Sequence, residues 1–301
     1  MLLTKDVILA GTLPDPDFEK LGHHPDVTEQ EIEIPVRHGC TILANVYLPA
    51  DPAAAGTALP VFIFFHGGGF CIGNRYDDFE SNRTIALRNK VTVVSPEYRL
   101  APEHPFPTAV YDGLDTLQWI AANAHRIHPS ASPSNGLIIG GTSSGGNIAS
   151  AVLYLNRDRE NPIPVSGQFL SVAPLLPDPV VPAKYRQAYT SAGENRSFAV
   201  PPPELVELFL CDPFNNPRGH ADIPRTYFQV CGLDPLRDES LIYEQELREN
   251  SIPTLLDFYP GLPHHFWEFF PQLTKHVERR TEDTVRGIQW LLEGSSKPHS
   301  R

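Results

Sequence analysis

The stretch Gly136-Leu137-Ile138-Ile139-Gly140-Gly141-Thr142-Ser143-Ser144-Gly145 decides the fold of this 301-residue chain. An apolar run of strand length leads into the pattern Gly-x-Ser-x-Gly, and residues 147–155 have the composition of a helix. A serine between a buried strand and a helix is typical of a nucleophile elbow. The turn is so sharp that it strains the serine backbone, and a side chain two residues away would collide with a neighbouring element. The pattern predicts that Ser143 is a nucleophile held at a helix N-terminus.

A second glycine-rich segment, His66-Gly67-Gly68-Gly69, directly follows the apolar run Val61–Phe65. Three consecutive glycines are costly in chain entropy unless the backbone itself must approach something. We expect the N–H groups of this loop to face an oxyanion, together with the N–H of Ser144. If the Gly-x-Ser-x-Gly pattern stood alone, it could equally be a glycine- and serine-rich turn between a strand and a helix with no catalytic role. The two segments in this order argue against that alternative.

The composition is that of an ordinary globular protein, with 41% hydrophobic and 20% charged residues and a net charge of −12. Because no basic patch stands out, we expect neither nucleic acid nor an anionic membrane surface as a partner. The four cysteines are widely spaced without a Cys-x-x-Cys pair, so we expect no disulfide framework, no metal and no cofactor. The N-terminus becomes charged too early for a signal peptide, and no segment approaches a transmembrane span. We therefore expect a cytoplasmic protein.

Apolar runs that alternate with helical stretches predict an α/β fold, with a mainly parallel central sheet covered by helices on both faces. The expected strands are Glu31–Pro35, Thr41–Tyr47, Val61–Phe65, Val91–Ser95, Leu137–Ile139, Gln168–Val172, Tyr227–Val230 and Leu255–Tyr259. The expected helices are Ser81–Lys90, Thr108–Ala124, Asn147–Asn156, Ser240–Asn250 and Lys275–Leu292. The helical spacing of apolar residues is clearest in Thr108–Ala124, which predicts one buried face there.

The chain is expected to divide into an N-terminal arm, residues 1–30, and a catalytic domain, residues 31–301. Within the domain, the proline-rich stretch at about residues 177–224 is too long for a simple connection. It predicts a cap inserted over the C-terminal edge of the sheet, to which the arm also contributes. Four of its apolar side chains line a substrate pocket or form the cap's own core: Leu205, Leu208, Phe209 and Phe214.

A serine hydroxyl is nearly inert at neutral pH without an adjacent base, and that base needs an orienting acid. Asp234 follows one expected strand, and the adjacent His264 and His265 follow the next, which gives the order serine, acid, histidine. Two alternatives stay open. In the first, Asp234 caps the helix that follows it and is not the acid. In the second, either His264 or His265 is the base, because spacing does not distinguish them. Asp238 is a weaker candidate acid, because one turn into a helix we expect it to face solvent or pair with an arginine.

Several linked segments resemble the hormone-sensitive-lipase-like serine esterases (fold-3) of the α/β-hydrolase superfamily over about residues 31–293. The segments are His66–Gly69, Tyr98–Pro107, Gly141–Gly145, Asp234–Glu239 and His264–Phe266. The resemblance implies an α/β-hydrolase fold with a cap. It implies that Ser143 is the nucleophile, Asp234 the acid and His264 the base, since the family's histidine precedes a small residue and then phenylalanine. It further implies oxyanion donors at the backbone N–H groups of Gly68, Gly69 and Ser144.

The resemblance also implies an activity, that of a serine carboxylesterase acting on short-to-medium acyl or other small-molecule esters. The pattern is similar to that of fungal members found in secondary metabolism. One alternative is a transacylase, or an ester-forming or ring-forming biosynthetic enzyme with the same triad. The other is a non-catalytic hydrolase-fold protein that binds a small molecule. Family analogy implies a homodimer through the edge strand Leu255–Tyr259.

Three positions depart from the family pattern. The residue before the nucleophile is usually acidic and is Thr142 here, and the residue after it is usually alanine and is Ser144. The residue after the catalytic histidine is usually glycine and is His265 here. None of the three removes a predicted catalytic group, because Ser144 still offers its backbone N–H.

Overall fold

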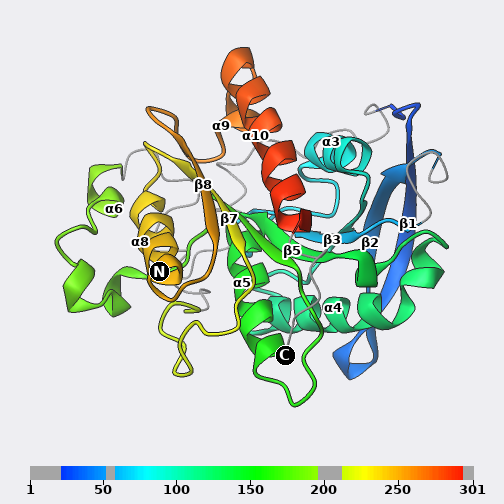
Figure 1. Cartoon of the computed structure of the whole chain (residues 1–301), viewed down its shortest axis with the longest axis horizontal. Coiled ribbons are helices and arrows are strands. Elements are labelled where there is room, and N and C mark those ends of the chain that lie inside the picture. The colour runs from blue at the N-terminus through cyan, green and yellow to red at the C-terminus, as the bar shows by residue number, and fades with distance from the viewer. Residues whose placement is uncertain (1–21, 52–57, 196–211, 294–301) are drawn as a thin grey trace.

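The computed structural model describes residues 22–51, 58–195 and 212–293, and its centre is an eight-stranded sheet (Figure 1). The strands lie in the order β1-β2-β4-β3-β5-β6-β7-β8. β1 and β2 form an antiparallel pair, β2 is antiparallel to β4, and the remaining neighbours are parallel. The predicted α/β fold with a mainly parallel sheet is therefore confirmed.

The bounds of the elements are close to those expected from the sequence. The strands are β1 (Val27–Val36), β2 (Cys40–Pro49), β3 (Val61–Phe65), β4 (Thr92–Pro96), β5 (Leu137–Thr142), β6 (Gly167–Ser171), β7 (Thr226–Cys231) and β8 (Thr254–Tyr259). The α-helices are α3 (Phe79–Asn89), α4 (Thr108–Ile127), α5 (Ser144–Arg157), α6 (Ser191–Glu194), α8 (Arg237–Glu249), α9 (Phe266–Phe269) and α10 (Thr274–Glu293). Single 3-10 turns are η2 (Arg37–Gly39), η3 (Pro133–Asn135), η4 (Asp178–Val180) and η5 (Ala183–Tyr185).

Helices cover both faces of the sheet and enclose two hydrophobic cores (Figure 1). On one face, α4, α5 and α8 bury apolar side chains such as Leu117, Val152 and Leu247 against the strands. On the other face, α3 and α10 do so with residues such as Ile85 and Ile288. Because both faces are covered, the central strands β3 and β5 are buried along their whole length. This is why they appear in the sequence as continuous apolar runs.

Two differences from the expected boundaries have clear causes. β1 begins at Val27, within the stretch expected to be an arm, because Val27–Val36 pairs residue by residue with β2. α5 begins at Ser144 and not at Asn147, because the chain passes from β5 into the helix through Ser143 alone. Gly145 and Gly146 lie in its first turn, where sequence propensity argues against a helix.

Parts of the predicted arm and cap lie outside the described residues, namely residues 1–21 and 196–211. These include Leu205, Leu208 and Phe209. Phe214 is described and belongs to a buried core, where its ring lies against Tyr185, His220 and Tyr243. Among the described residues, no helix combines the length and the apolar character needed to span a membrane.

We predict that Gly287→Ala destabilises the fold although alanine favours helices by about 1 kcal/mol over glycine. A Cβ on Gly287 of α10 would lie 2.1 Å from the Tyr227 ring. That ring cannot move aside easily, since it stacks on Phe169 and its hydroxyl donates to Asp257. We expect a net loss of about 1–3 kcal/mol in the free energy of unfolding, measured by denaturant titration.

Gly193→Ala in α6 is the matched control, because a Cβ there would meet no atom within 4 Å. It should leave the unfolding free energy unchanged or slightly higher. Equal stability of the Gly287 variant and the wild type would contradict the tight contact between α10 and the sheet.

Candidate active site

Ser143 lies at the turn between β5 and α5 in a strained backbone conformation. Its φ is 52° and its ψ is −122°, a combination that residues other than glycine rarely adopt. The Ser143 N–H donates to the Ser171 carbonyl of β6 at 2.8 Å, which fixes the turn to the neighbouring strand. The side chain is nearly buried, with 5% of the residue exposed. Strain at a serine between a strand and a helix is what the predicted nucleophile elbow requires.

The two glycines of the Gly-x-Ser-x-Gly pattern are needed for packing. A Cβ on Gly141 would lie 2.3 Å from the Phe65 carbonyl oxygen, and one on Gly145 would lie 2.1 Å from the same atom. Both contacts are with the backbone at the end of β3, which cannot move without disturbing the sheet. The predicted collision of side chains two residues on either side of Ser143 is confirmed.

The glycine loop after β3 lies directly beside the serine. A Cβ on Gly67 would be 3.6 Å from the Ser143 Cβ. Gly68 and Gly69 have positive φ values of 117° and 57°, and the Gly68 carbonyl accepts the N–H groups of Cys71 and Ile72. A Cβ on Gly68 would lie 2.1 Å from the Ile72 carbonyl oxygen, so this tight turn excludes any side chain there.

His66 supports the glycine loop as a buried, neutral residue. Burial lowers the pKa of His66 to about 4. Its ring stacks on Tyr98 with centroids 4.2 Å apart, and its Nδ1 lies 2.7 Å from the Gly67 carbonyl oxygen. The Tyr98 hydroxyl donates to the His66 carbonyl at 3.0 Å. Tyr98 opens the Tyr98–Pro107 segment, which therefore fixes the path of the glycine loop.

The carboxyl ends of β5, β7 and β8 lie at one edge of the sheet and bring Ser143, Asp234 and His264 together. The Ser143 hydroxyl donates to Nε2 of His264, with 3.1 Å between Oγ and Nε2. Nδ1 of His264 donates to Oδ2 of Asp234 at 2.7 Å. Asp234 is 1% exposed and His264 is 7% exposed, so this chain of hydrogen bonds is largely shielded from water.

The structure separates the alternatives that the sequence left open. Asp234 does not cap α8, which begins at Arg237 after Leu236, but its Oδ1 accepts the Leu236 N–H at 2.8 Å and orders the turn. Nε2 of His265 lies 3.7 Å from Oδ1 of Asp78, whereas Nε2 of His264 contacts the Ser143 hydroxyl. The neighbouring histidine is therefore the one that meets the serine.

The expectation that Asp238 faces solvent is wrong, although its pairing with an arginine is confirmed. Asp238 is 5% exposed and pairs with Arg237 at 2.8 Å. Its Oδ2 also accepts the backbone N–H groups of Thr190 and Ser191, each at 2.7 Å. A burial of this kind could not be inferred from position in a helix, because its partners lie some fifty residues earlier in the chain.

Glu239, the next residue of α8, makes a second set of such contacts. Its Oε2 accepts the N–H groups of Leu175 at 2.7 Å and Leu176 at 2.8 Å. Asp238 thus holds the predicted cap by its backbone at Thr190 and Ser191, and Glu239 holds the residues that immediately precede the cap. Neither Glu239 nor Asp78 fits a catalytic spacing in the sequence, so no pattern predicts a role for them.

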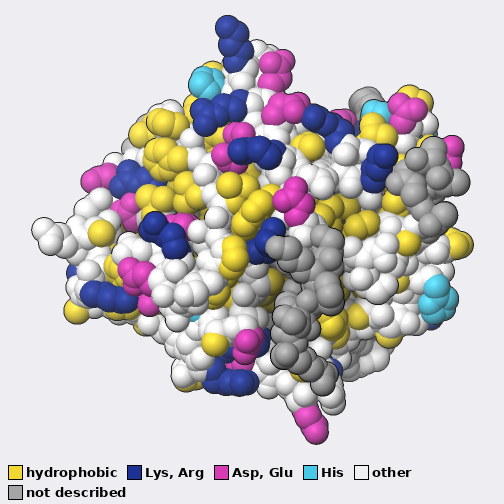
Figure 2. All heavy atoms as spheres, in the orientation of Figure 1, with side chains coloured by type: hydrophobic (Ala, Val, Ile, Leu, Met, Phe, Trp, Pro, Cys, Tyr) yellow, Lys and Arg dark blue, Asp and Glu magenta, His cyan; other side chains and the backbone are white. Residues whose placement is uncertain are grey.

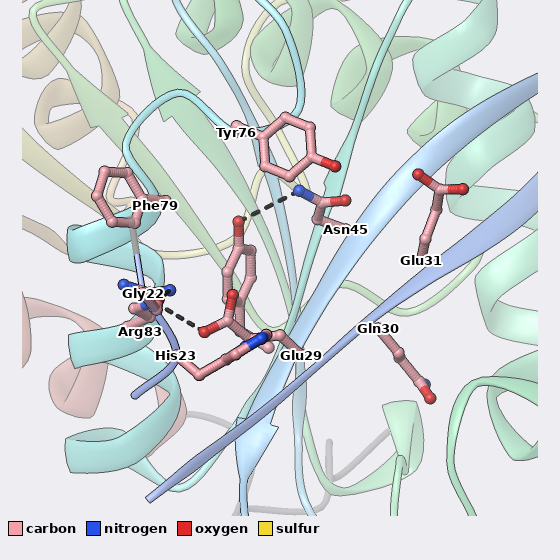
Figure 3. A pocket seen from close by; sticks show the side chains of 10 residues that line it. Gly22, His23, Glu29, Gln30, Glu31, Asn45, Tyr76, Phe79 and Arg83 are labelled. Carbon is pink, nitrogen blue, oxygen red and sulfur yellow. Dashed lines mark hydrogen bonds and ion pairs between the residues drawn. The ribbon is translucent and has the colours of Figure 1, made fainter. Parts of the chain in front are cut away.

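A pocket of about 310 Å³ lies away from these residues, between β1, β2 and α3 (Figure 3). Its walls include the rings of Tyr47, Tyr76 and Phe79, and they do not include Ser143 or His264. Arg83 in its wall pairs with Glu29 at 2.8 Å and lies over the Phe79 ring. The second carboxylate of the wall, Glu31, pairs with Arg75, which lies outside the wall.

Residues 62–268 match a family model described as the alpha/beta hydrolase fold. An AB hydrolase superfamily protein of Schizosaccharomyces pombe is 32% identical over 283 residues, which cover 90% of this chain and 82% of that protein. A versiconal hemiacetal acetate esterase of Dothistroma septosporum is 32% identical over 251 residues, which cover 78% of this chain and 74% of that protein.

Among solved structures, vibralactone cyclase has a TM-score of 0.81 at 30% identity, and the match covers 97% of this chain and 86% of that chain. Carboxylesterases occur among the further relatives and the further solved structures. The matched residues 62–268 include the glycine loop, the serine turn and both strand ends that carry Asp234 and His264.

Proposed function

Because the chain belongs to the α/β-hydrolase fold family, we propose that it is a serine carboxylesterase that hydrolyses small-molecule esters. The predicted fold and the resemblance to hormone-sensitive-lipase-like esterases are confirmed, and the chain is a hydrolase. The alternative of a non-catalytic binding protein is accordingly set aside. The identity of the catalytic residues, the substrate and the role of the cap belong to the proposal.

The observation that carries the proposal is the relay from Ser143 through His264 to Asp234, with hydrogen bonds of 3.1 and 2.7 Å. His264 takes the proton of Ser143 as its oxygen attacks the ester carbonyl. Asp234 orients the imidazole and stabilises the imidazolium that forms. The protonated His264 then donates its proton to the leaving alcohol. In the second step His264 takes a proton from water as the water attacks the acyl-enzyme, and it returns that proton to Ser143 as the acid leaves.

Charge develops on the carbonyl oxygen during each attack, and backbone N–H groups stabilise it. The proposed donors are Gly68, Gly69 and Ser144. Ser144 is the first residue of α5, and a helix has no internal acceptor for the N–H groups of its first turn. The helix dipole there also favours negative charge. The contact between Gly67 and Ser143 supports the placement of the glycine loop beside the same oxygen.

Substrates in this proposal are esters with short-to-medium acyl groups, including esters of secondary metabolites. One similar protein is named for an acetate ester, which favours a small acyl group. A panel of p-nitrophenyl esters of increasing chain length measures the depth of the acyl pocket. The cap, formed by the part of the arm that precedes β1 and by the insertion at about residues 177–224, covers the site in this proposal. A cytoplasmic location stays a prediction from the sequence.

A second candidate is acyl transfer to an acceptor other than water, either an alcohol or a hydroxyl of the substrate itself. The likeness to vibralactone cyclase, a protein named for ring formation, favours this candidate. Product analysis with an added alcohol separates the two. Preferential formation of the new ester would count against a simple hydrolase.

We predict that Ser143→Ala lowers kcat for a p-nitrophenyl short-acyl ester on the order of 10⁴–10⁶-fold, because it removes the hydroxyl that attacks the carbonyl in the proposed mechanism. Ser144→Ala is the matched control and should keep nearly full activity, since it retains the backbone N–H. Both variants should unfold at the wild-type temperature. Substantial residual activity in the Ser143 variant would overturn the assignment.

We predict that Ser144→Pro lowers kcat by about 10²–10³-fold, because proline has no N–H to donate to the oxyanion. Proline is well tolerated at the first position of a helix, so the fold should persist. Circular dichroism checks the fold, and Ser144→Ala again serves as the control. Unchanged kcat in a folded proline variant would exclude Ser144 as a donor.

We predict a homodimer through β8, which ends the sheet and pairs with β7 on one side among the described strands. Most of its residues are half-exposed, and Figure 2 shows hydrophobic side chains gathered over this part of the surface. An uncovered strand edge is a ready template for pairing with a second chain. Size-exclusion chromatography with light scattering should give twice the chain mass, and a monomer at all concentrations would refute this prediction.

A further inference from the structure

A second cluster of charged side chains lies beside the relay and takes no part in it. His265 follows His264 in the chain, and Asp78 immediately precedes α3. Glu268 belongs to α9 and Arg280 to α10. The cluster therefore connects two segments. One is the loop after β8, which carries His264, and the other runs from the glycine loop to Asp78 at the start of α3.

His265 and Asp78 are the buried centre of this cluster. Nε2 of His265 lies 3.7 Å from Oδ1 of Asp78 and 3.1 Å from Oε2 of Glu268. The Asp78 side chain is 2% exposed and that of His265 is 12% exposed, whereas Glu268 is 45% exposed. Water screens the attraction of Glu268 but not that of Asp78. Asp78 is accordingly the main counter-charge of His265.

The other groups around Asp78 do not replace His265. Trp267 donates its Nε1–H to Oδ1 of Asp78 at 3.4 Å, which is a neutral contact. Arg280 stacks over the Trp267 ring and donates to Ser81 and Gln229. Among the described residues, His265 is the one basic side chain within 4 Å of the Asp78 carboxylate. A buried carboxylate without a close cation is costly, so this contact favours the imidazolium form of His265.

Both members of the pair have a left-handed backbone. The φ of His265 is 53° and that of Asp78 is 59°. Glycine would adopt this conformation without strain. A histidine here is compatible with a stable turn when its side chain makes a compensating interaction, and the contact with Asp78 is that interaction.

We propose that protonated His265, paired with Asp78, is a positioning residue that holds His264 against Ser143, so that turnover falls when His265 loses its proton. This inference rests on the proposed function. One peptide bond joins His265 to His264, and Asp78 lies twelve positions after His66 in the chain. The pair thus ties the proposed base to the segment with the proposed oxyanion donors. Loss of the tie loosens the 3.1 Å contact between His264 and Ser143.

The electrostatics of the surrounding groups support the charged form. Burial by itself lowers the pKa of His265, but Asp78 and Glu268 outweigh burial and the opposing charge of Arg280, and the net effect raises the pKa above its ordinary value. Asp77 also faces this cluster, and burial raises its pKa to about 7. A histidine with a raised pKa in the folded state contributes stability below pH of about 6.5, which is lost as the pH rises through the folded value.

The test compares the pH dependence of kcat for a p-nitrophenyl ester in the wild type and in His265→Asn. Asparagine tolerates the left-handed backbone but carries no charge. We expect the wild-type kcat to fall on the alkaline side. We expect the variant to lack this fall and to be about 10–100-fold slower than the wild type at neutral pH, because small misplacements of catalytic groups have effects of this size. Asp78→Asn removes the carboxylate of the same ion pair and should give the same pH profile of kcat as His265→Asn.

Two further variants serve as controls, one for the effect of the left-handed backbone and one for the loss of a histidine elsewhere. His265→Gly relaxes the turn but removes the cation, and it should behave as His265→Asn does. His276→Asn removes an exposed histidine of α10 and should keep the wild-type profile. An Hε1 resonance that titrates above pH 6.5 in the NMR spectrum of the wild type should be absent from His265→Asn.

The outcomes distinguish the inference from the function on which it rests. A wild type that hydrolyses no ester overturns both, before any variant is compared. An active wild type whose alkaline profile is unchanged in His265→Asn and Asp78→Asn overturns the inference alone. A loss of the same factor at every pH, with the alkaline fall retained, also overturns it, because it reveals a purely structural role.

Discussion

The whole arrangement depends on the strained backbone of Ser143, which is the single residue between β5 and α5. A conformation of this kind is unfavourable by about 1–3 kcal/mol and persists only where its surroundings impose it. Here β3 imposes it through the Phe65 carbonyl, against which Gly141 and Gly145 pack without side chains. On the other side, the Ser171 carbonyl of β6 holds the Ser143 N–H. The buried strands β3 and β6 thus stabilise the turn that places the Ser143 hydroxyl at the edge of the sheet.

Much of this could be predicted because the signals were local. The apolar run of β3 predicts its bounds, and that of β5 predicts its start, although β5 continues through Gly140 and Gly141 to Thr142. The glycines around Ser143 and after His66 mark backbone that approaches other backbone. The parallel sheet then brought Asp234 and His264 to the same edge as the serine. For the same reason, three segments far apart in the sequence could be assigned to one site before any contact was known.

What could not be predicted depends on contacts between distant segments. Spacing does not distinguish His264 from His265, because the turn between them decides which ring meets the serine and which meets Asp78. The burial of Asp238 arises from amides nearly fifty residues earlier in the chain. The sequence predicts a later start for α5 than the structure has, because Gly145 and Gly146 disfavour a helix; close packing against the sheet outweighs that propensity.

Asp238 holds the described part of the insertion and Glu239 holds the residues just before it, and this has a consequence for how this protein can diversify. Both carboxylates grip main-chain amides, at Leu175, Leu176, Thr190 and Ser191, and an amide is the same whatever side chain stands beside it. Residues around these four points are thus free to drift under selection while the attachment persists. In the proposed function, a change of side chains in this stretch would alter the cap without detaching it from α8.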